Sequence, residues 1–299
     1  MPARKFIQLT TTDKYINSDA NIAGPNYTKY ESVLYYFLTN IVDMYPHLTV
    51  SYPLVFTGSH NLSWLSNTDI NKYLELDYVP SIPGTFYIYH ELARLYLSKP
   101  LPILSSIISV GLDPGFIEYA NHAGMINSKT IIRFLGTPKG NTALETFISE
   151  KTPATKHITH SGPLTNKTVY DLLLDDLVIP ASSKADVVTF NYYTIMMGID
   201  YNFAFMQNIS NLVGMLFGLK HLAQGGTFII HLYAIISKTS ADIYLILKDY
   251  FTTANLYYPE CANEYFATGT WAVFTGFKGV KPDALVKLFG LLDDMKQIT

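Results

Sequence analysis

The spacing of apolar residues changes about a third of the way along the chain. Up to residue 98, helical spacing from Tyr30 to Tyr45 and from Phe86 to Leu97 is interrupted by several prolines. From residue 99 onward, short runs rich in β-branched and aromatic residues alternate with helical patterns. The alternation predicts an α/β domain over residues 99–299, built from βαβ units around a mostly parallel sheet. Residues 1–98 are expected to form an extension packed on this core.

The predicted strands of the core are residues 103–111, 130–135, 185–190, 227–233 and 270–278. The predicted helices are residues 116–123, 170–178, 201–222, 241–250 and 282–295. A turn over residues 113–115 connects the first strand to its helix. The Gln-Gly-Gly sequence at residues 224–226 is expected to end the long third helix.

The amino-acid composition argues against several classes of protein. Only 15% of the 299 residues are charged while 48% are hydrophobic, which favours a component of a larger assembly. A net charge of -3, from 21 basic and 24 acidic residues, argues against a protein that holds nucleic acid by bulk electrostatics. The single cysteine, Cys261, excludes a disulfide framework and a cysteine-based zinc cluster. With neither a signal-peptide pattern nor a membrane-length apolar run, we expect a cytoplasmic protein without a membrane partner.

The sequence lacks the motifs of several classes of enzyme. The sequence contains no Gly-x-Ser-x-Gly, Walker loop or His-Glu-x-x-His pattern, which disfavours hydrolases, nucleotide switches and metalloproteases. His157 and His160 have a spacing seen in metal sites, but no third ligand accompanies them in the sequence. We interpret them as loop histidines and predict no metal site.

Four segments, in this order, resemble one enzyme family. They are the turn Pro-Gly-Phe-Ile-Glu-Tyr at 114–119, the strand Asp-Val-Val-Thr-Phe-Asn at 186–191, the strand at 227–233 after Gly-Gly, and the segment 268–278. Together they resemble the FtsJ-type (RrmJ-like) ribose 2′-O-methyltransferases, which include the mRNA cap methyltransferases of eukaryotes and large DNA viruses. The resemblance covers roughly residues 90 to 280. It implies a Rossmann-like class I methyltransferase fold, with a mostly parallel sheet flanked by helices.

The same resemblance implies a degenerate catalytic site. Members of the family use a Lys-Asp-Lys-Glu tetrad, in which the central lysine activates the ribose 2′-hydroxyl. Asn191 stands at the aspartate position, His231 at the second lysine and Gly269 at the glutamate. The first lysine position offers at most Arg94, whose guanidinium cannot replace a titrating amine.

The implied cofactor turn is altered as well. Pro114 removes a backbone N–H donor, and Asp113 adds negative charge where the cofactor carboxylate would lie. No Asp or Glu lies between Glu118 and Glu145, where an acid normally holds the ribose hydroxyls of the cofactor. We therefore expect no cofactor, or S-adenosylmethionine if the protein is active. The degenerate cofactor residues are Gly111, Asp113, Pro114, Gly115 and Phe116.

The favoured hypothesis is a catalytically degenerate cap 2′-O-methyltransferase-like protein of viral origin. This pseudoenzyme would read capped RNA or dock on a protein partner in a transcription, capping or translation complex. Tyr192 and Tyr193 follow Asn191 at a position that borders the substrate groove of this fold, so they and His231 are the candidate RNA contacts. Packing of the two tyrosines in a core or interface is the alternative for them.

Two other functions remain open. In the first, the protein is an active, divergent RNA 2′-O-methyltransferase that uses His231 as general base, with Arg94 and Glu264 assisting. In the second, it is a structural component of a virion or complex, with affinity for neither RNA nor cofactor. The expected location is the host cytoplasm or a viral factory, or the virion.

Overall fold

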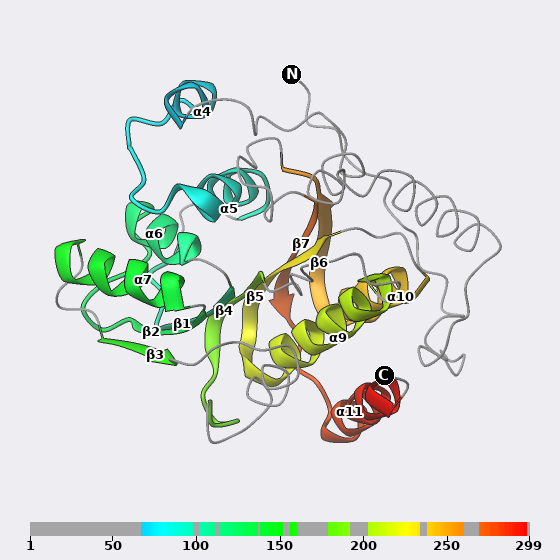
Figure 1. Cartoon of the computed structure of the whole chain (residues 1–299). Coiled ribbons are helices and arrows are strands. Elements are labelled where there is room, and N and C mark those ends of the chain that lie inside the picture. The colour runs from blue at the N-terminus through cyan, green and yellow to red at the C-terminus, as the bar shows by residue number, and fades with distance from the viewer. Residues whose placement is uncertain are drawn as a thin grey trace.

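The computed structural model describes residues 67–97, 102–111, 114–136, 138–151, 156–160, 179–191, 203–233, 238–259 and 269–297. In this part of the chain, a single seven-stranded sheet lies between two groups of helices (Figure 1). The strands are β1 (Ser106–Gly111), β2 (Ile131–Gly136), β3 (Lys156–His160), β4 (Ala185–Asn191), β5 (Leu222–Tyr233), β6 (Phe251–Tyr257) and β7 (Thr270–Phe277).

The strand order is β3-β2-β1-β4-β5-β7-β6. The first five strands in this order are parallel, and β7 runs antiparallel to both β5 and β6. The chain first adds strands on one side of β1 and then returns to add β4 and β5 on the other side, so the order reverses between β1 and β4. This topology confirms the predicted α/β, Rossmann-like methyltransferase fold.

Helices cover both faces of the sheet. They are α4 (Asn67–Leu74), α5 (Pro83–Tyr96), α6 (Gly115–His122), α7 (Pro138–Lys151), α9 (Phe203–His221), α10 (Lys238–Asp249) and α11 (Pro282–Gln297). α5, α6 and α7 lie on one face, and α9, α10 and α11 on the other (Figure 1). None of the helices in the described ranges is both long and apolar enough to span a membrane.

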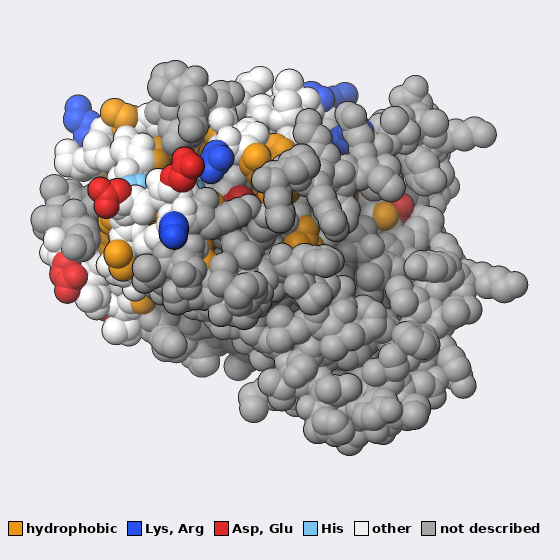
Figure 2. Space-filling model, turned by 90° about the horizontal axis from the view of Figure 1, so that it is seen from above, with side chains coloured by type: hydrophobic (Ala, Val, Ile, Leu, Met, Phe, Trp, Pro, Cys, Tyr) orange, Lys and Arg blue, Asp and Glu red, His pale blue; other side chains and the backbone are white. Residues whose placement is uncertain are grey.

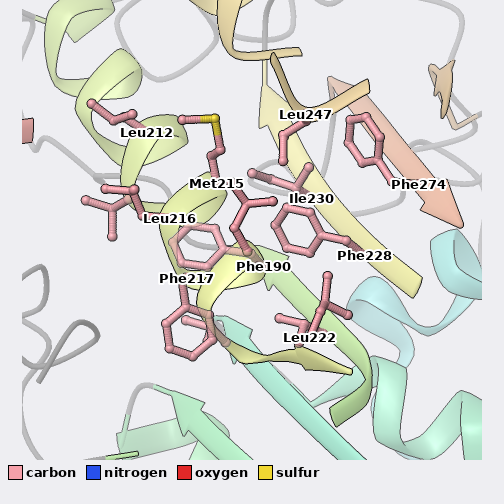
Figure 3. Packing of buried hydrophobic residues seen from close by; sticks show 14 of the residues in the cluster. Phe190, Leu212, Met215, Leu216, Phe217, Leu222, Phe228, Ile230, Leu247 and Phe274 are labelled. Carbon is pink, nitrogen blue, oxygen red and sulfur yellow. The ribbon is translucent and has the colours of Figure 1, made fainter. Parts of the chain in front are cut away.

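Successive side chains along each strand point to opposite faces of the sheet, so each face has its own hydrophobic core. The α9 face is mostly apolar: Phe190, Phe228 and Phe274 belong there to one cluster with side chains of α9 and α10 (Figure 3). Buried polar groups such as Asn208, Asn211 and Ser240 lie on these two helices and are hydrogen-bonded. The α5 face mixes apolar and polar side chains, and at its centre the Thr189 hydroxyl donates a 2.8 Å hydrogen bond to Ser109 Oγ. Because a buried polar group is costly unless it is paired, the polar face is the more informative one for function.

Two glycines one turn apart allow α9 to lie close to the sheet. A Cβ atom added at Gly214 would lie 2.7 Å from the Phe190 ring, and one at Gly218 would lie 2.7 Å from the Phe228 ring. The Phe228 ring cannot easily move, because it packs on the rings of Phe251 and Phe274.

We expect Gly218→Ala to lower the free energy of unfolding by about 1–3 kcal/mol, because overpacking outweighs the better helix propensity of alanine. Gly290 in α11 is the matched control, since a Cβ added there meets nothing within 4 Å. Gly290→Ala should raise stability by up to about 1 kcal/mol. Urea unfolding of both variants tests this; equal stabilisation by both would contradict the close packing of α9.

Burial of two tyrosines predicts a loss of stability in alkali. Burial raises the pKa of Tyr119 and of Tyr244 from 10.0 to about 12. The folded protein therefore keeps these phenol protons when the unfolded chain loses them. The stabilisation is complete below pH 10 and is lost as the pH rises from about 10 to 12. We expect Tyr119→Phe to flatten the dependence of unfolding free energy on pH above 10, measured by urea unfolding; an unchanged slope would contradict the prediction.

Two predictions of local structure are wrong. The glycine pair does not end the long helix: α9 ends at His221, and Gly225 and Gly226 lie within β5. The pairing of β5 with β4 is irregular there, and a Cβ added at Gly226 would lie 3.0 Å from the Asp186 carbonyl oxygen, so close approach of two backbones explains this glycine. His157 and His160 are also not in a loop, because their segment pairs with β2 as the strand β3.

The remaining predicted elements occur with shifts of a few residues, except the helical segments at 30–45 and 170–178, which lie outside the described residues. The residues of α4, α7, β3 and β6 were not predicted as helices or strands. The boundary between residues 98 and 99 stays a prediction. α5 precedes that boundary and shares a hydrophobic core with the sheet.

Candidate ligand site at the carboxyl edge of the sheet

Six residues form one row across the sheet at the carboxyl ends of the parallel strands. Gly111 pairs with Gly136 on one side and with Asn191 on the other. Trp271 pairs with His231 and with Tyr257. Phe190 pairs with Ile230, which places the next residues, Asn191 and His231, at the same level. The complete row is therefore Gly136, Gly111, Asn191, His231, Trp271 and Tyr257.

This row includes the point where the strand order reverses, between Gly111 on β1 and Asn191 on β4. Open α/β sheets bind ligands outside the carboxyl ends of their strands at such a reversal. Gly111 has a packing reason to be glycine: a Cβ there would lie 3.2 Å from the Asn191 carbonyl oxygen. The close approach of β1 and β4 brings the two strand ends together at the candidate site.

His231 is held by two neighbours in the row. Its Nδ1–H donates a 2.9 Å hydrogen bond to Asn191 Oδ1, because an amide oxygen can only accept. The imidazole also stacks on the Trp271 indole, with ring centroids 4.6 Å apart and planes 11° apart. His231 is 2% exposed, Asn191 1% and Trp271 0%. The structure thus brings together Asn191 and His231, two of the four catalytic positions that the sequence resemblance selected.

Gly269 lies at the start of β7, next to this group. Its φ angle of 122° falls in the region that favours glycine, so a side chain there would be strained. A glutamate at this position would need a different backbone. Glu264, the alternative acid, lies outside the described residues, as do Tyr192, Tyr193 and Asp113.

Arg94 is not part of the row. It lies in the last turn of α5 with its side chain exposed. The α5 side chains that contact the row include Tyr89, Glu91 and Tyr96, which the sequence analysis did not select. The Tyr96 ring lies 5.8 Å from the Tyr257 ring. The Tyr89 ring makes edge contacts with Trp271, at 5.5 Å, and with Phe116 of α6, at 5.1 Å. The Tyr257 hydroxyl donates a hydrogen bond to the buried Glu91 carboxylate.

The turn after β1 leads into α6. Pro114 is the residue before the helix, and no side chain there makes a capping hydrogen bond. Gly115 and Phe116 begin the helix and are buried. Pro114 brings no N–H to this edge, as expected from the sequence.

Glu118, the acidic residue in the first turn of α6, is hydrogen-bonded to the segment that precedes α5. It is 0% exposed, and its carboxylate accepts hydrogen bonds from the Tyr78 hydroxyl (2.7 Å) and from the backbone N–H groups of Ser81 and Ile82 (2.6 Å each). Burial, with the Glu118 hydrogen bond and charge, raises the pKa of Tyr78. Glu118 therefore fixes the start of α5, the helix that carries Tyr89 and Glu91 to the row.

The residues at this edge do not fit the ribose of S-adenosylmethionine. In nucleoside-binding sites of this kind, an acid at the end of the second strand holds the ribose hydroxyls. Here β2 ends at Gly136, which has no side chain. The ring of Phe134 fills the adjoining space, since a Cβ added at Gly136 would lie 2.1 Å from it. Within the described residues, this position provides neither the carboxylate nor the room.

The face seen from above has no region of one charge among its described residues, because Lys and Arg side chains are interspersed there with Asp and Glu side chains (Figure 2). The row itself consists of uncharged side chains and a histidine.

No family model matches the sequence, and no curated protein matches it significantly. Solved structures of methyltransferases resemble the fold at a distance. A ribosomal RNA methyltransferase from Plasmodium falciparum is 15% identical, with a TM-score of 0.44 over 66% of this chain and 98% of its own. An rRNA methylase from Clostridium thermocellum is 7% identical, with a TM-score of 0.40 over 67% and 100%. Aeropyrum pernix fibrillarin, solved with S-adenosyl-L-methionine, is 12% identical, with a TM-score of 0.37 over 62% and 73%.

Proposed function

We propose that this protein is a catalytically inactive member of the methyltransferase fold that reads RNA, capped mRNA in particular, in a viral transcription, capping or translation complex. The proposal rests on the contacts of His231, which stands where the resembled family has a lysine. Its imidazole donates a hydrogen bond to the Asn191 amide oxygen and stacks on the Trp271 ring.

This arrangement is poorly suited to activating a ribose hydroxyl. The lysine of the family is oriented by acidic residues, whereas the row neighbour that hydrogen-bonds to His231, Asn191, is a neutral amide. The glutamate position is Gly269, whose backbone disfavours any side chain. The carboxylate that α5 brings to the row, Glu91, accepts a hydrogen bond from Tyr257. These substitutions remove the charges that the chemistry requires.

The same features are compatible with binding RNA. Single-stranded RNA is recognised by aromatic rings that stack on its bases and by hydrogen bonds to base edges, in addition to contacts with its phosphates. Trp271, Tyr89 and Phe116 form a linked set of buried aromatic rings behind the carboxyl edge, which hold His231 in place rather than stack on bases. Tyr192 and Tyr193 follow directly in sequence after Asn191 and remain predicted contacts.

One observation favours the alternative of an active enzyme. Because Nδ1 of His231 carries the proton donated to Asn191, Nε2 is the unprotonated ring nitrogen when the imidazole is neutral. A histidine oriented in this way by an amide is a known arrangement for a general base. This alternative requires the cofactor, which the residues around Gly136 do not fit.

The test combines two assays on the full chain. Fluorescence anisotropy with short capped and uncapped RNAs measures binding, and transfer of a labelled methyl group from S-adenosylmethionine to capped RNA measures activity. We expect binding, tighter for capped RNA, and no methyl transfer by the wild type or by His231→Ala. Methyl transfer that His231→Ala abolishes would establish the enzyme alternative. Absence of both binding and transfer would contradict the proposal and leave a structural role.

A further inference from the structure

The side-chain amide of Asn191 carries a hydrogen-bond donor without a partner. Asn191 is 1% exposed, and its Oδ1 already accepts the hydrogen bond from His231. Its Nδ2 is buried and has no hydrogen-bond partner in the part of the chain that the structure describes. Buried donors in native proteins are almost always paired, so an unpaired one at a candidate site requires an explanation.

The location of this donor points to a ligand. Asn191 ends β4 opposite Gly111, where the strand order of the sheet reverses and where α/β sheets bind their ligands. The facing residue, Gly111, has no side chain that could accept the hydrogen bond. A group that comes from outside the sheet can therefore supply the missing acceptor.

The Asn191 amide selects a hydrogen-bond acceptor. It can offer only its donor, since its oxygen is engaged by His231. Among nucleobases, guanine and uracil present a carbonyl oxygen where adenine and cytosine present an amino group. An amide donor pairs with a carbonyl but opposes an amino group.

We infer that the Asn191 amide reads keto bases, guanine or uracil, in the bound RNA and discriminates against adenine and cytosine. This inference rests on the proposed RNA binding and adds a base preference to it. The preference arises from one hydrogen bond, because Nδ2 donates to the carbonyl oxygen of the base, whereas an amino group at that position would leave two donors facing each other.

The test compares oligonucleotides that differ in the group that Asn191 would contact. Anisotropy titrations of the full chain use oligouridine against oligocytidine of equal length, and RNAs carrying inosine against the same RNAs carrying adenosine. We expect the keto member of each pair to bind about fivefold to tenfold more tightly. Asn191→Asp replaces the donor by an acceptor and retains an oxygen for His231, so it should abolish the preference.

Gln224→Glu is the matched control, because it makes the same amide-to-acid change at an exposed position of β5. It should keep the preference. If Asn191→Asp does not fold, the two wild-type comparisons still decide the matter. RNA binding with equal affinity within each pair, or with a preference for cytosine and adenine, would overturn the inference and leave the proposed function intact. Absence of RNA binding would overturn both.

Discussion

Replacing Glu118 by alanine is expected to lower the free energy of unfolding by about 3 kcal/mol. The fully buried carboxylate accepts hydrogen bonds from the Tyr78 hydroxyl and from the N–H groups of Ser81 and Ile82. Alanine would leave these donors without their acceptor and would leave a gap under the start of α5. The loss should be visible as a lower midpoint of urea unfolding.

A more conservative variant separates hydrogen bonding from volume. Glu118→Gln keeps the size of the side chain but places an NH₂ group against an N–H or O–H donor, so we expect an intermediate loss. Glu145→Ala in α7 is the matched control, because Glu145 is exposed and should change stability by less than about 0.5 kcal/mol. Equal effects of Glu118→Ala and Glu145→Ala would show that Glu118 does not hold the start of α5.

Trp271→Ala is the second change for which we expect a large loss, of about 3–5 kcal/mol in unfolding free energy. Trp271 is 0% exposed, and its ring contacts both His231 and Tyr89. Removing the indole would leave a cavity between α5 and the sheet and would free the His231 ring from its stacking partner. Chemical denaturation measures the first effect, and the NMR signals of the His231 imidazole report the second.

The control for Trp271 is Val286→Ala in α11, where the apolar side chain is 69% exposed and its truncation should have little effect. Trp271→Phe should fall between the two, since a smaller ring can retain part of the contact with His231. If Trp271→Ala unfolded at the same denaturant concentration as the wild type, the packed row at the carboxyl edge would be wrong.

The order of the elements could be predicted because the β-rich runs and helical patterns of the core are local. The strands ending at Gly111 and Asn191 are short runs rich in Ile, Val and Phe between turn residues, which is typical of buried parallel strands. The edge strand β6 escaped prediction because its middle residues are exposed or half-buried, so it lacks that pattern. The glycine pair was misread because a turn and an irregular strand use glycine for the same conformational freedom.

The site could be predicted in part. The resemblance selected Asn191 and His231, and the structure places them in direct contact. It could not select Tyr89 or Glu91, whose importance depends on the packing of α5 against β6 and β7. Nor could it reveal the role of Glu118, whose partners lie 36 to 40 residues earlier in the chain. Long-range contacts of this kind leave no local pattern in the sequence.

We propose that the fold has lost its cofactor and kept a site for RNA. The most direct test is isothermal titration calorimetry of the purified chain with S-adenosylmethionine and S-adenosylhomocysteine, with a short capped RNA titrated in parallel. We predict heat of binding for the RNA and none for either cofactor, because Gly136 and the Phe134 ring occupy the place of the ribose-binding acid. Binding of S-adenosylmethionine with a micromolar dissociation constant would contradict the account.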